Sequence, residues 1–348
     1  MFVELRRGAI VESRHLVHVA VLDGAGTLVA HAGNPDVVTF LRSTAKPFQA
    51  LPLVEDGVVE HFGITTAELA LCCASHSSEP AQVDIARGLL RRIGCSERDL
   101  LCGPHTPLSE RVAADYAARG VRLTSVHSNC SGKHAGMLAL ARHHGWPTAG
   151  YVGPEHPVQQ RCLAEVARWT GLPPGDVATA VDGCGVVCFA VPLRNLAMAY
   201  ATLGRGERGE VLDGPHRADA SRRQVPLPSP LSRGAAVVAA MLAHPELIAG
   251  EGRPCTDLMR AHRGRVVAKV GAEGVYAALV LPDGLGVALK VEDGHDGAAA
   301  LALAAVLAHL GLASPPALVA RPIRNTLGET VGELRVNGGV MREKDGRS

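Results

Sequence analysis

Two residues three positions apart, Ser43 and Lys46, could supply a nucleophile and its base. Because Pro47 is tolerated only in the first turn of a helix, a helix is predicted to begin at about Ser43 or Thr44. Lys46 then lies on the same face one turn later, within reach of the Ser43 hydroxyl. A lysine acts as a base only when burial or a neighbouring cation lowers its pKa toward 7. On this short motif alone, a capped helix with a surface lysine is an equally good interpretation.

Side chains of the same types recur in two later segments. The apolar run Leu69–Cys73 ends in a loop that contains Ser75, and Lys269 lies on a predicted strand. This order of a Ser-x-x-Lys motif, a serine loop and a Lys-x-Gly strand is similar to that of serine β-lactamases and penicillin-binding proteins, which perform acyl transfer. Two Ser/Lys pairs would then share one site.

A third cluster could bind an ion. Gly132 and Lys133 at a helix start are similar to part of a phosphate loop, but the glycine four positions upstream is missing, which disfavours nucleotide binding. Cys130 and Cys184 could be thiolate ligands of zinc. Because two cysteines do not complete a tetrahedral site, their spacing alone favours buried structural cysteines.

Composition excludes several classes of protein. Apolar residues make up 47% and charged residues 20% of the 348, which is typical of globular domains. Aromatic residues are only 3% and the formal net charge is +1, so a nucleic-acid partner is not expected. The nine cysteines form no short disulfide framework, and charges or histidines interrupt every apolar run. We therefore predict a cytoplasmic protein that contacts no membrane.

The pattern of elements predicts an α+β fold. Strands are predicted on both sides of the turn at Asp23–Gly26 and again near the end of the chain, with helices between them. The chain is expected to be a single catalytic unit over 1–348. One antiparallel sheet is predicted from the two ends of the chain, at about 1–40 and 263–348, and a mainly helical portion at about 41–262. Within the helical portion, residues 205–228 are predicted to form a solvated loop or a lid over the site. The helices are predicted at 82–93, 109–119, 133–144, 157–170 and 297–310, and the late strands at 265–270, 275–281 and 286–291.

Taken together, these clusters resemble the asparaginase II family, the Rhizobium-type inducible, thermolabile L-asparaginases. The resemblance is carried by long blocks that include Leu41–Ala50, Asn129–Leu138, Lys269–Gly274 and Ala288–Gly294. It implies a fold like those of serine β-lactamases and glutaminases, a homodimer, and hydrolysis of L-asparagine to L-aspartate and ammonia.

The resemblance also implies a role for each matching residue. Ser43 would be the nucleophile and Lys46 its base, with Ser75 and Lys269 as the second pair. One zinc ion per chain, which positions groups and does not drive hydrolysis, would be held by Cys130, Lys133 and Cys184 with a water. His134 and Asp182 would lie beside the metal or the substrate. Arg42 could bind the substrate or could equally form a surface ion pair.

Three positions depart from the family pattern. Ser78 stands where a glycine is usual, Val187 where a proline is usual, and Gly297 where an arginine is common. The alternatives to an asparaginase are therefore a glutaminase or β-lactam hydrolase of the same fold, or a zinc-dependent amino-acid-binding protein without turnover.

Overall fold

The two ends of the chain meet in one antiparallel sheet. A computed structural model describes residues 1–204, 233–281 and 283–342, so the predicted loop or lid at 205–228 lies outside the described residues. The sheet has the order β10-β11-β1-β2-β9-β8-β7, and β3 joins β2 on one side and β12 on the other. Its strands are β1 (Phe2–Arg7), β2 (Ile10–Leu22), β3 (Leu28–Ala32), β7 (Val266–Val270), β8 (Val275–Val280), β9 (Leu285–Val291), β10 (Ala320–Arg324), β11 (Thr330–Asn337) and β12 (Met341–Arg342).

A second, smaller sheet takes two of its three strands from the stretch that the sequence predicted to be mainly helical. It has the order β4-β6-β5, with β4 (Val38–Phe40) and β5 (Ala178–Val181) on either side of β6 (Val187–Pro192). The backbone N–H of Leu41 donates to the carbonyl of Phe189 at 2.8 Å, which ties the chain just before Ser43 to β6. The small sheet therefore positions the start of the Ser-x-x-Lys segment.

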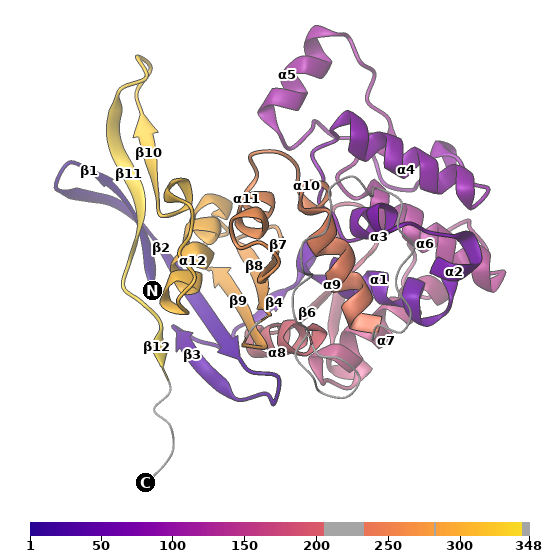
Figure 1. Ribbon diagram of the computed structural model, residues 1–348, viewed down its shortest axis with the longest axis horizontal. Coiled ribbons are helices and arrows are strands. Elements are labelled where there is room, and N and C mark those ends of the chain that lie inside the picture. Colours follow the sequence, from indigo (N-terminus) through magenta and orange to yellow (C-terminus); the bar gives the residue numbers. More distant parts are fainter. Residues whose placement is uncertain (205–232, 282, 343–348) are drawn as a thin grey trace.

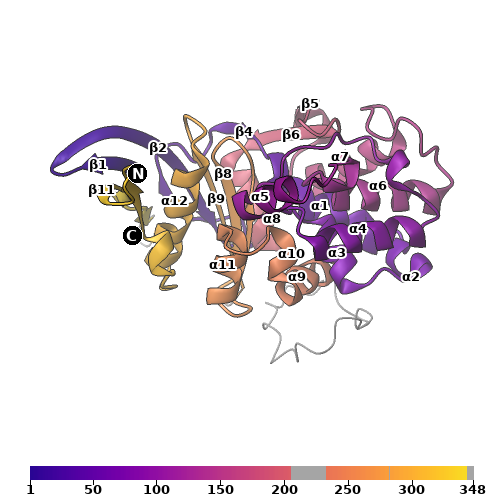
Figure 2. The same ribbon diagram turned by 90° about the horizontal axis from the view of Figure 1, so that it is seen from above.

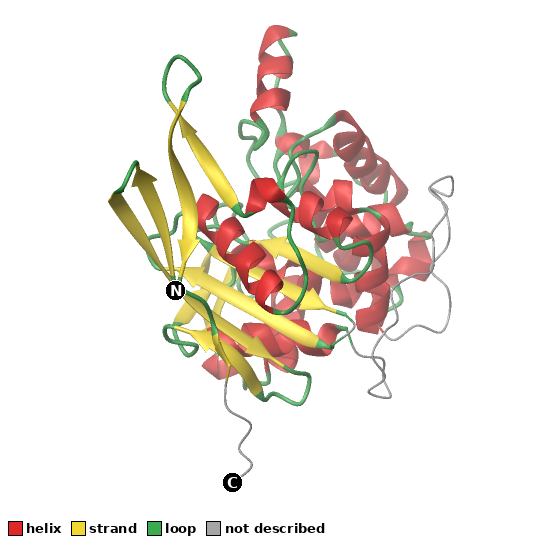
Figure 3. Cartoon of the chain, turned by 60° about the vertical axis from the view of Figure 1, so that its left-hand side comes forward, coloured by secondary structure: helices red, strands yellow, loops and turns green. Residues whose placement is uncertain are grey.

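Most of the helices, among them α1 to α4, α6, α7 and α9, gather on the other side of the molecule (Figures 1 and 3). Helix α1 is at their centre, and every residue from Lys46 to Leu53 is buried. Helices α3, α6, α7 and α9 contact it. The helices are α1 (Lys46–Glu55), α2 (Val58–Phe62), α3 (Thr66–Cys72), α4 (Pro80–Arg92), α5 (Glu110–Ala118), α6 (Ser131–His144), α7 (Pro157–Thr170), α8 (Leu193–Leu203), α9 (Arg233–Ala243), α10 (Pro245–Ile248), α11 (Pro254–Ala261) and α12 (Asp296–His309).

The main sheet lies between α12 on one side and α8 on the other (Figure 2). Helix α8 contacts β2, β8 and β9, while α12 contacts β8, β9 and β11. The core between them is built almost entirely from Ala, Val and Leu side chains, as the low aromatic content requires. Among the residues described, no helix is both long and apolar enough to cross a membrane.

The predicted α+β class, with an antiparallel sheet assembled from both chain ends, is confirmed. The predicted helices and late strands correspond to α4 to α7, β7 to β9 and α12, with ends that differ by a few residues. The helix at the Ser-x-x-Lys segment differs in one respect. Arg42–Ala45 form a 3-10 turn, and the α-helix starts only at Lys46 with Pro47 in its first turn.

Candidate active site

Ser43 lies in a turn that is anchored on both sides. The Thr44 hydroxyl donates to the carbonyl of Leu41 at 2.7 Å, and the Tyr200 hydroxyl donates to the carbonyl of Thr44 at 2.9 Å. The preceding residue, Arg42, has a φ of +50°, a left-handed conformation that costs a non-glycine residue about 1 kcal/mol. The turn thus holds Ser43 at the wall of a cavity, and in the described part of the chain its hydroxyl has no hydrogen-bond partner.

Two lysine amines converge on one serine oxygen. Lys46 on α1 donates to the Ser75 Oγ at 3.1 Å, and Lys269 on β7 donates to the same atom at 2.8 Å. Lys46 also bonds the carbonyl of Ala74, and Lys269 bonds the carbonyl of Val270. Both lysines are buried, so the fold encloses two basic groups around a single hydroxyl.

The environment of Lys269 favours its neutral form. Burial, followed by the positive charges of Lys46 and Arg253, lowers the pKa of Lys269 from 10.5 to about 7. The lysine therefore changes charge close to neutral pH, where a proton-transfer group is most useful.

The loop that carries Ser75 is fixed by hydrogen bonds from three directions. The Ser75 N–H donates to Ile248, the Ser77 hydroxyl donates to Ala249, and Arg253 donates to the Ser75 carbonyl at 3.1 Å. His76 accepts the Ser78 N–H at Nδ1, so its Nε2 carries the proton that is donated to Ser131 at 2.8 Å. These contacts join the loop to the segment before α11 and to the start of α6.

Ser78, one of the three departures, keeps a backbone conformation that suits glycine. Its φ is +59°, in the left-handed region. The Ser78 hydroxyl donates to the carbonyl of His127 at 2.6 Å, and its own carbonyl accepts from the Tyr116 hydroxyl at 2.7 Å. The hydroxyl and the carbonyl of Ser78 are thus both bonded to neighbouring segments in this conformation.

Cys130, Lys133 and Cys184 lie together in the interior. Helix α6 approaches α3 so closely here that a Cβ at Gly132 would overlap the carbonyl of Leu71, so only glycine fits. The Lys133 amine is 3.0 Å from the Cys184 Sγ. A hydrogen bond from Cys184, with the positive charges of Lys46 and Lys133, holds the pKa of the Cys130 thiol well below its usual range, against the opposing effect of burial.

This donor set fits a zinc ion. A buried thiol that is inclined to ionise, a half-buried thiol and a buried amine meet here, and zinc can displace the protons from such groups. Within the described residues, no three His, Cys, Asp or Glu side chains gather so as to hold a metal, so the set depends on the Lys133 amine.

Arg42 and Asp182 form an ion pair beside this cluster. The Arg42 Nε donates to the Asp182 Oδ1 at 2.9 Å. Burial raises the pKa of Asp182, but Lys133 and Arg42 outweigh it and hold the pKa below its usual value. The carboxylate is therefore ionised and partly enclosed, next to a cation.

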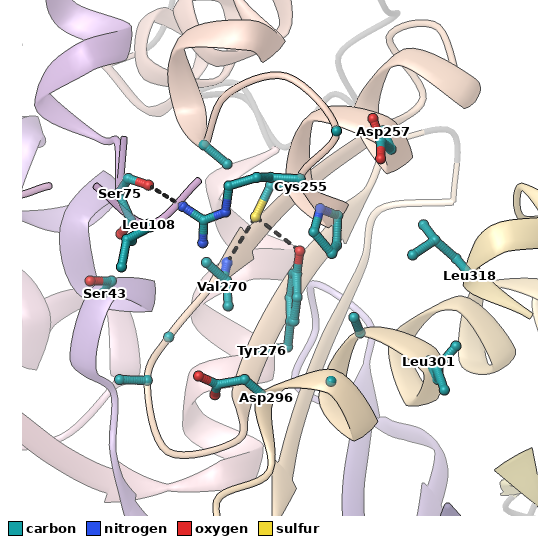
Figure 4. Close-up of a pocket in the computed structure, with 18 of the residues that line it drawn as sticks. Ser43, Ser75, Leu108, Cys255, Asp257, Val270, Tyr276, Asp296, Leu301 and Leu318 are labelled. Atoms are coloured by element: carbon teal, nitrogen blue, oxygen red, sulfur yellow. Dashed lines mark hydrogen bonds between the residues drawn. The ribbon is translucent and has the colours of Figure 1, made fainter. Parts of the chain in front are cut away.

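A cavity of about 620 Å³ opens at Ser43 and Ser75. Figure 4 shows these serines and Leu108 on one side and Leu301 and Leu318 on the other, with Tyr276 between them. Arg253, Cys255, Asp296 and Gly297 also line it. Residues from α11, β7, β8 and α12 thus surround the two serines.

A family model identifies the chain. The model for L-asparaginase II matches residues 3–336. The chain belongs to the L-asparaginase II family. No curated protein matches this family member in sequence.

Several solved structures are similar to this L-asparaginase II family member at low identity. A protein titled Mglu, in its native form, is 16% identical with a TM-score of 0.44, over 85% of this chain and 65% of that one. This chain thus spans less than two thirds of the length of Mglu. A β-lactamase from Mycobacterium bovis is 17% identical with a TM-score of 0.36, over 84% and 94% of the two chains. A mutant of simvastatin synthase from Aspergillus terreus is 10% identical with a TM-score of 0.33, over 79% and 86%.

In this L-asparaginase II family member, the predicted site residues form one group around Ser75 and a second group around Lys133, and His134 lies apart from the cavity. Ser43 and Ser75 line the cavity, and the buried amines of Lys46 and Lys269 bond the Ser75 Oγ. Cys130 contacts Lys46 through a hydrogen bond. His134 is fully buried, bonds the Tyr151 hydroxyl at 2.6 Å and does not line the cavity.

Three residues of the site were missed from the sequence. Arg253 and Cys255 flank Pro254 at the start of α11, and the Cys255 Sγ lies 2.9 Å from the Tyr276 hydroxyl. The sequence offers one signal for the first two, since Pro254 between them is typical of the first turn of a helix. Nothing in the sequence places that turn beside Ser75.

Proposed function

We propose that the protein is an L-asparaginase that hydrolyses L-asparagine to L-aspartate and ammonia through an acyl-enzyme on Ser43. The observation that carries the proposal is the Ser75 oxygen, which is bonded to the amines of both Lys46 and Lys269 in a cavity that Ser43 also lines. Membership of the L-asparaginase II family supports the choice of L-asparagine as the substrate.

In the proposed reaction, Lys46 first loses its own proton, and its neutral amine then takes the Ser43 proton as the Ser43 Oγ attacks the side-chain amide carbon. Ser75 then passes a proton from Lys46 to the leaving nitrogen, and ammonia departs. Lys269 must be neutral, because a second positive charge beside Lys46 would oppose the first transfer. Water then attacks the ester carbon and gives a proton to Lys46, the bond between that carbon and the Ser43 Oγ breaks, and Lys46 returns the proton to Ser43.

Arg42 and Asp182 are proposed to hold the amino-acid end of the substrate. A zwitterion presents a carboxylate to the guanidinium and an ammonium to the carboxylate, so the existing ion pair is complementary to it. Arg42→Gln and Asp182→Asn are each expected to raise KM tenfold or more, because each leaves one charge of the zwitterion and one of the protein unpaired. Steady-state kinetics with asparagine tests this.

Zinc is proposed to be bound by Cys130, Lys133 and Cys184. When bound, it supplies a fixed positive charge that organises the wall of the site. The chain is also proposed to act as a homodimer, which light scattering would test.

The nucleophile is tested by Ser43→Ala. Release of ammonia and aspartate from asparagine should vanish in this variant, while Ser109→Ala, at a half-buried serine before α5, serves as the matched control and keeps full activity. Undiminished turnover in Ser43→Ala would remove Ser43 from the mechanism.

Substrate choice needs a direct comparison. Glutamine differs from asparagine by one methylene, which is worth only about 1–3 kcal/mol in a pocket. Rates with asparagine, glutamine and a chromogenic β-lactam, measured on one preparation, rank the three activities. Binding of asparagine in calorimetry with no product formed would instead identify an amino-acid-binding protein.

A further inference from the structure

The cavity beyond the two serines is much larger than asparagine requires. Its volume is about 620 Å³, in the range of pockets that bury drug-sized molecules. A single small amino acid at Ser43 would leave most of this space empty. The excess therefore indicates room for a larger substrate.

Most of the extra space has an apolar wall. Leu108, Tyr276, Leu301 and Leu318 line it, and Figure 4 shows the two leucines of α12 and the following turn across the cavity from Ser43. The carboxylate of Asp296 is engaged by the Gly274 N–H at 2.9 Å. An apolar group that enters the cavity would leave water for this wall and gain free energy.

The positions of the polar groups determine which end of the substrate faces this wall. In the proposed reaction Ser75 delivers the proton to the leaving nitrogen, so that nitrogen lies next to Ser75, which lines the cavity. Arg42 and Asp182, which would hold the amino-acid end, do not line it. A substituent on the amide nitrogen would therefore extend into the apolar space.

We propose that the site also hydrolyses L-asparagine derivatives that carry an apolar group on the side-chain amide nitrogen, releasing a primary amine in place of ammonia. This inference rests on the proposed function. The Ser43 Oγ forms a bond to the amide carbon, the carbon–nitrogen bond breaks, and the proton that Ser43 gave up reaches the nitrogen through Lys46 and Ser75. Water then splits the ester to give L-aspartate.

The test compares three compounds on the full chain. L-Asparagine and N4-benzyl-L-asparagine both yield L-aspartate, which chromatography quantifies in the same way for each. The third compound, Nα-benzoyl-L-asparagine, carries the same ring at the amino-acid end. The kcat/KM for the N4-benzyl compound is expected to equal or exceed that for asparagine, and the Nα-benzoyl compound is expected to be cleaved at least 100-fold less efficiently.

A matched pair of variants tests the location. Ala317 is exposed and lines the cavity, whereas Ala313 is exposed and does not. Ala317→Trp is expected to lower the ratio of the N4-benzyl to the asparagine kcat/KM at least tenfold, and Ala313→Trp to leave it within twofold. Partial unfolding of a variant lowers both rates together and leaves the ratio unchanged.

Each result bears on a different statement. The inference would be overturned if asparagine were cleaved and turnover of the N4-benzyl compound were more than 100-fold weaker. Preference for the Nα-benzoyl compound, or an unchanged ratio in Ala317→Trp, would overturn it as well. In each case the asparaginase assignment stands. Absence of turnover with all three compounds would instead defeat the proposed function.

Discussion

Replacing Lys269 with methionine is expected to stabilise the folded protein near neutral pH, although it removes an amine of the site. The pKa of Lys269 is lowered by burial to about 7 in the folded protein, whereas an unfolded chain binds the same proton with a pKa of ~10.4. Between these two values the unfolded state holds more protons than the folded state, so the free energy of unfolding of the natural protein rises with pH. Below pH 7 the folded protein bears the full free-energy cost of burying the charged Lys269.

The structure gives the size of this cost. The lowering of the pKa from 10.5 to about 7 corresponds to about 5 kcal/mol at ~1.4 kcal/mol per unit. Methionine has a similar length but loses the hydrogen bonds to Ser75 and Val270, which contribute about 1 kcal/mol each. A net stabilisation of about 3 kcal/mol is expected at pH 7.

Urea unfolding at pH 7.5 and 9.5 measures the effect, at one protein concentration and with a thiol reductant. The advantage of Lys269→Met over the natural protein should shrink by about 2–3 kcal/mol between the two pH values, because only in the natural protein does the loss of the lysine proton raise the stability. Ser43→Ala is the control, since its difference from the natural protein should be the same at both. A Lys269→Met difference that does not change with pH would refute the reasoning.

Three further predictions concern rate, metal and packing. The kcat/KM for asparagine should rise with pH through about 7 as Lys269 becomes neutral. Arg253→Gln removes a nearby positive charge and should move this transition to higher pH in a profile from pH 5.5 to 9. A transition at the same pH in the variant would contradict this explanation. Elemental analysis of protein purified without chelator should find one zinc per chain, absent in Cys130→Ala and retained in Cys188→Ala, and metal-free natural protein would defeat the assignment. Gly286→Ala should destabilise the protein by about 1–3 kcal/mol or more in urea unfolding, because the added Cβ would overlap the backbone of α8, and unchanged stability would show that α8 can move away.

The long periodic segments of the fold could be predicted from the sequence. Helix α7 (Pro157–Thr170) has the residue limits that its apolar period and the following Gly171 indicate. Strand β6 (Val187–Pro192) could not be found in this way, because all but its last residue are buried and such a run has no alternation to detect. Short buried strands are assigned by their partners, which lie far away in the sequence.

The site also has residues that could be predicted from the sequence and contacts that could not. The spacing of the motif predicts Lys46 as a site residue. Its amine bonds Ser75, in a loop 29 residues later, and no spacing rule links those two residues. His134, next to a proposed zinc ligand, faces Tyr151 because successive residues of a helix point in different directions. Side-chain direction therefore depends on tertiary packing, which a motif does not contain.

The pairing of the two chain ends has a consequence for synthesis on the ribosome. His15, in the second strand of the first hairpin, bonds Asp293 at 2.6 Å, 278 residues later. At about 5–20 residues per second, the early strands wait tens of seconds for these partners, with an open edge that chaperones must protect. Lys269 enters the site over the same interval, so a nascent chain cannot turn over substrate until nearly its whole length has emerged.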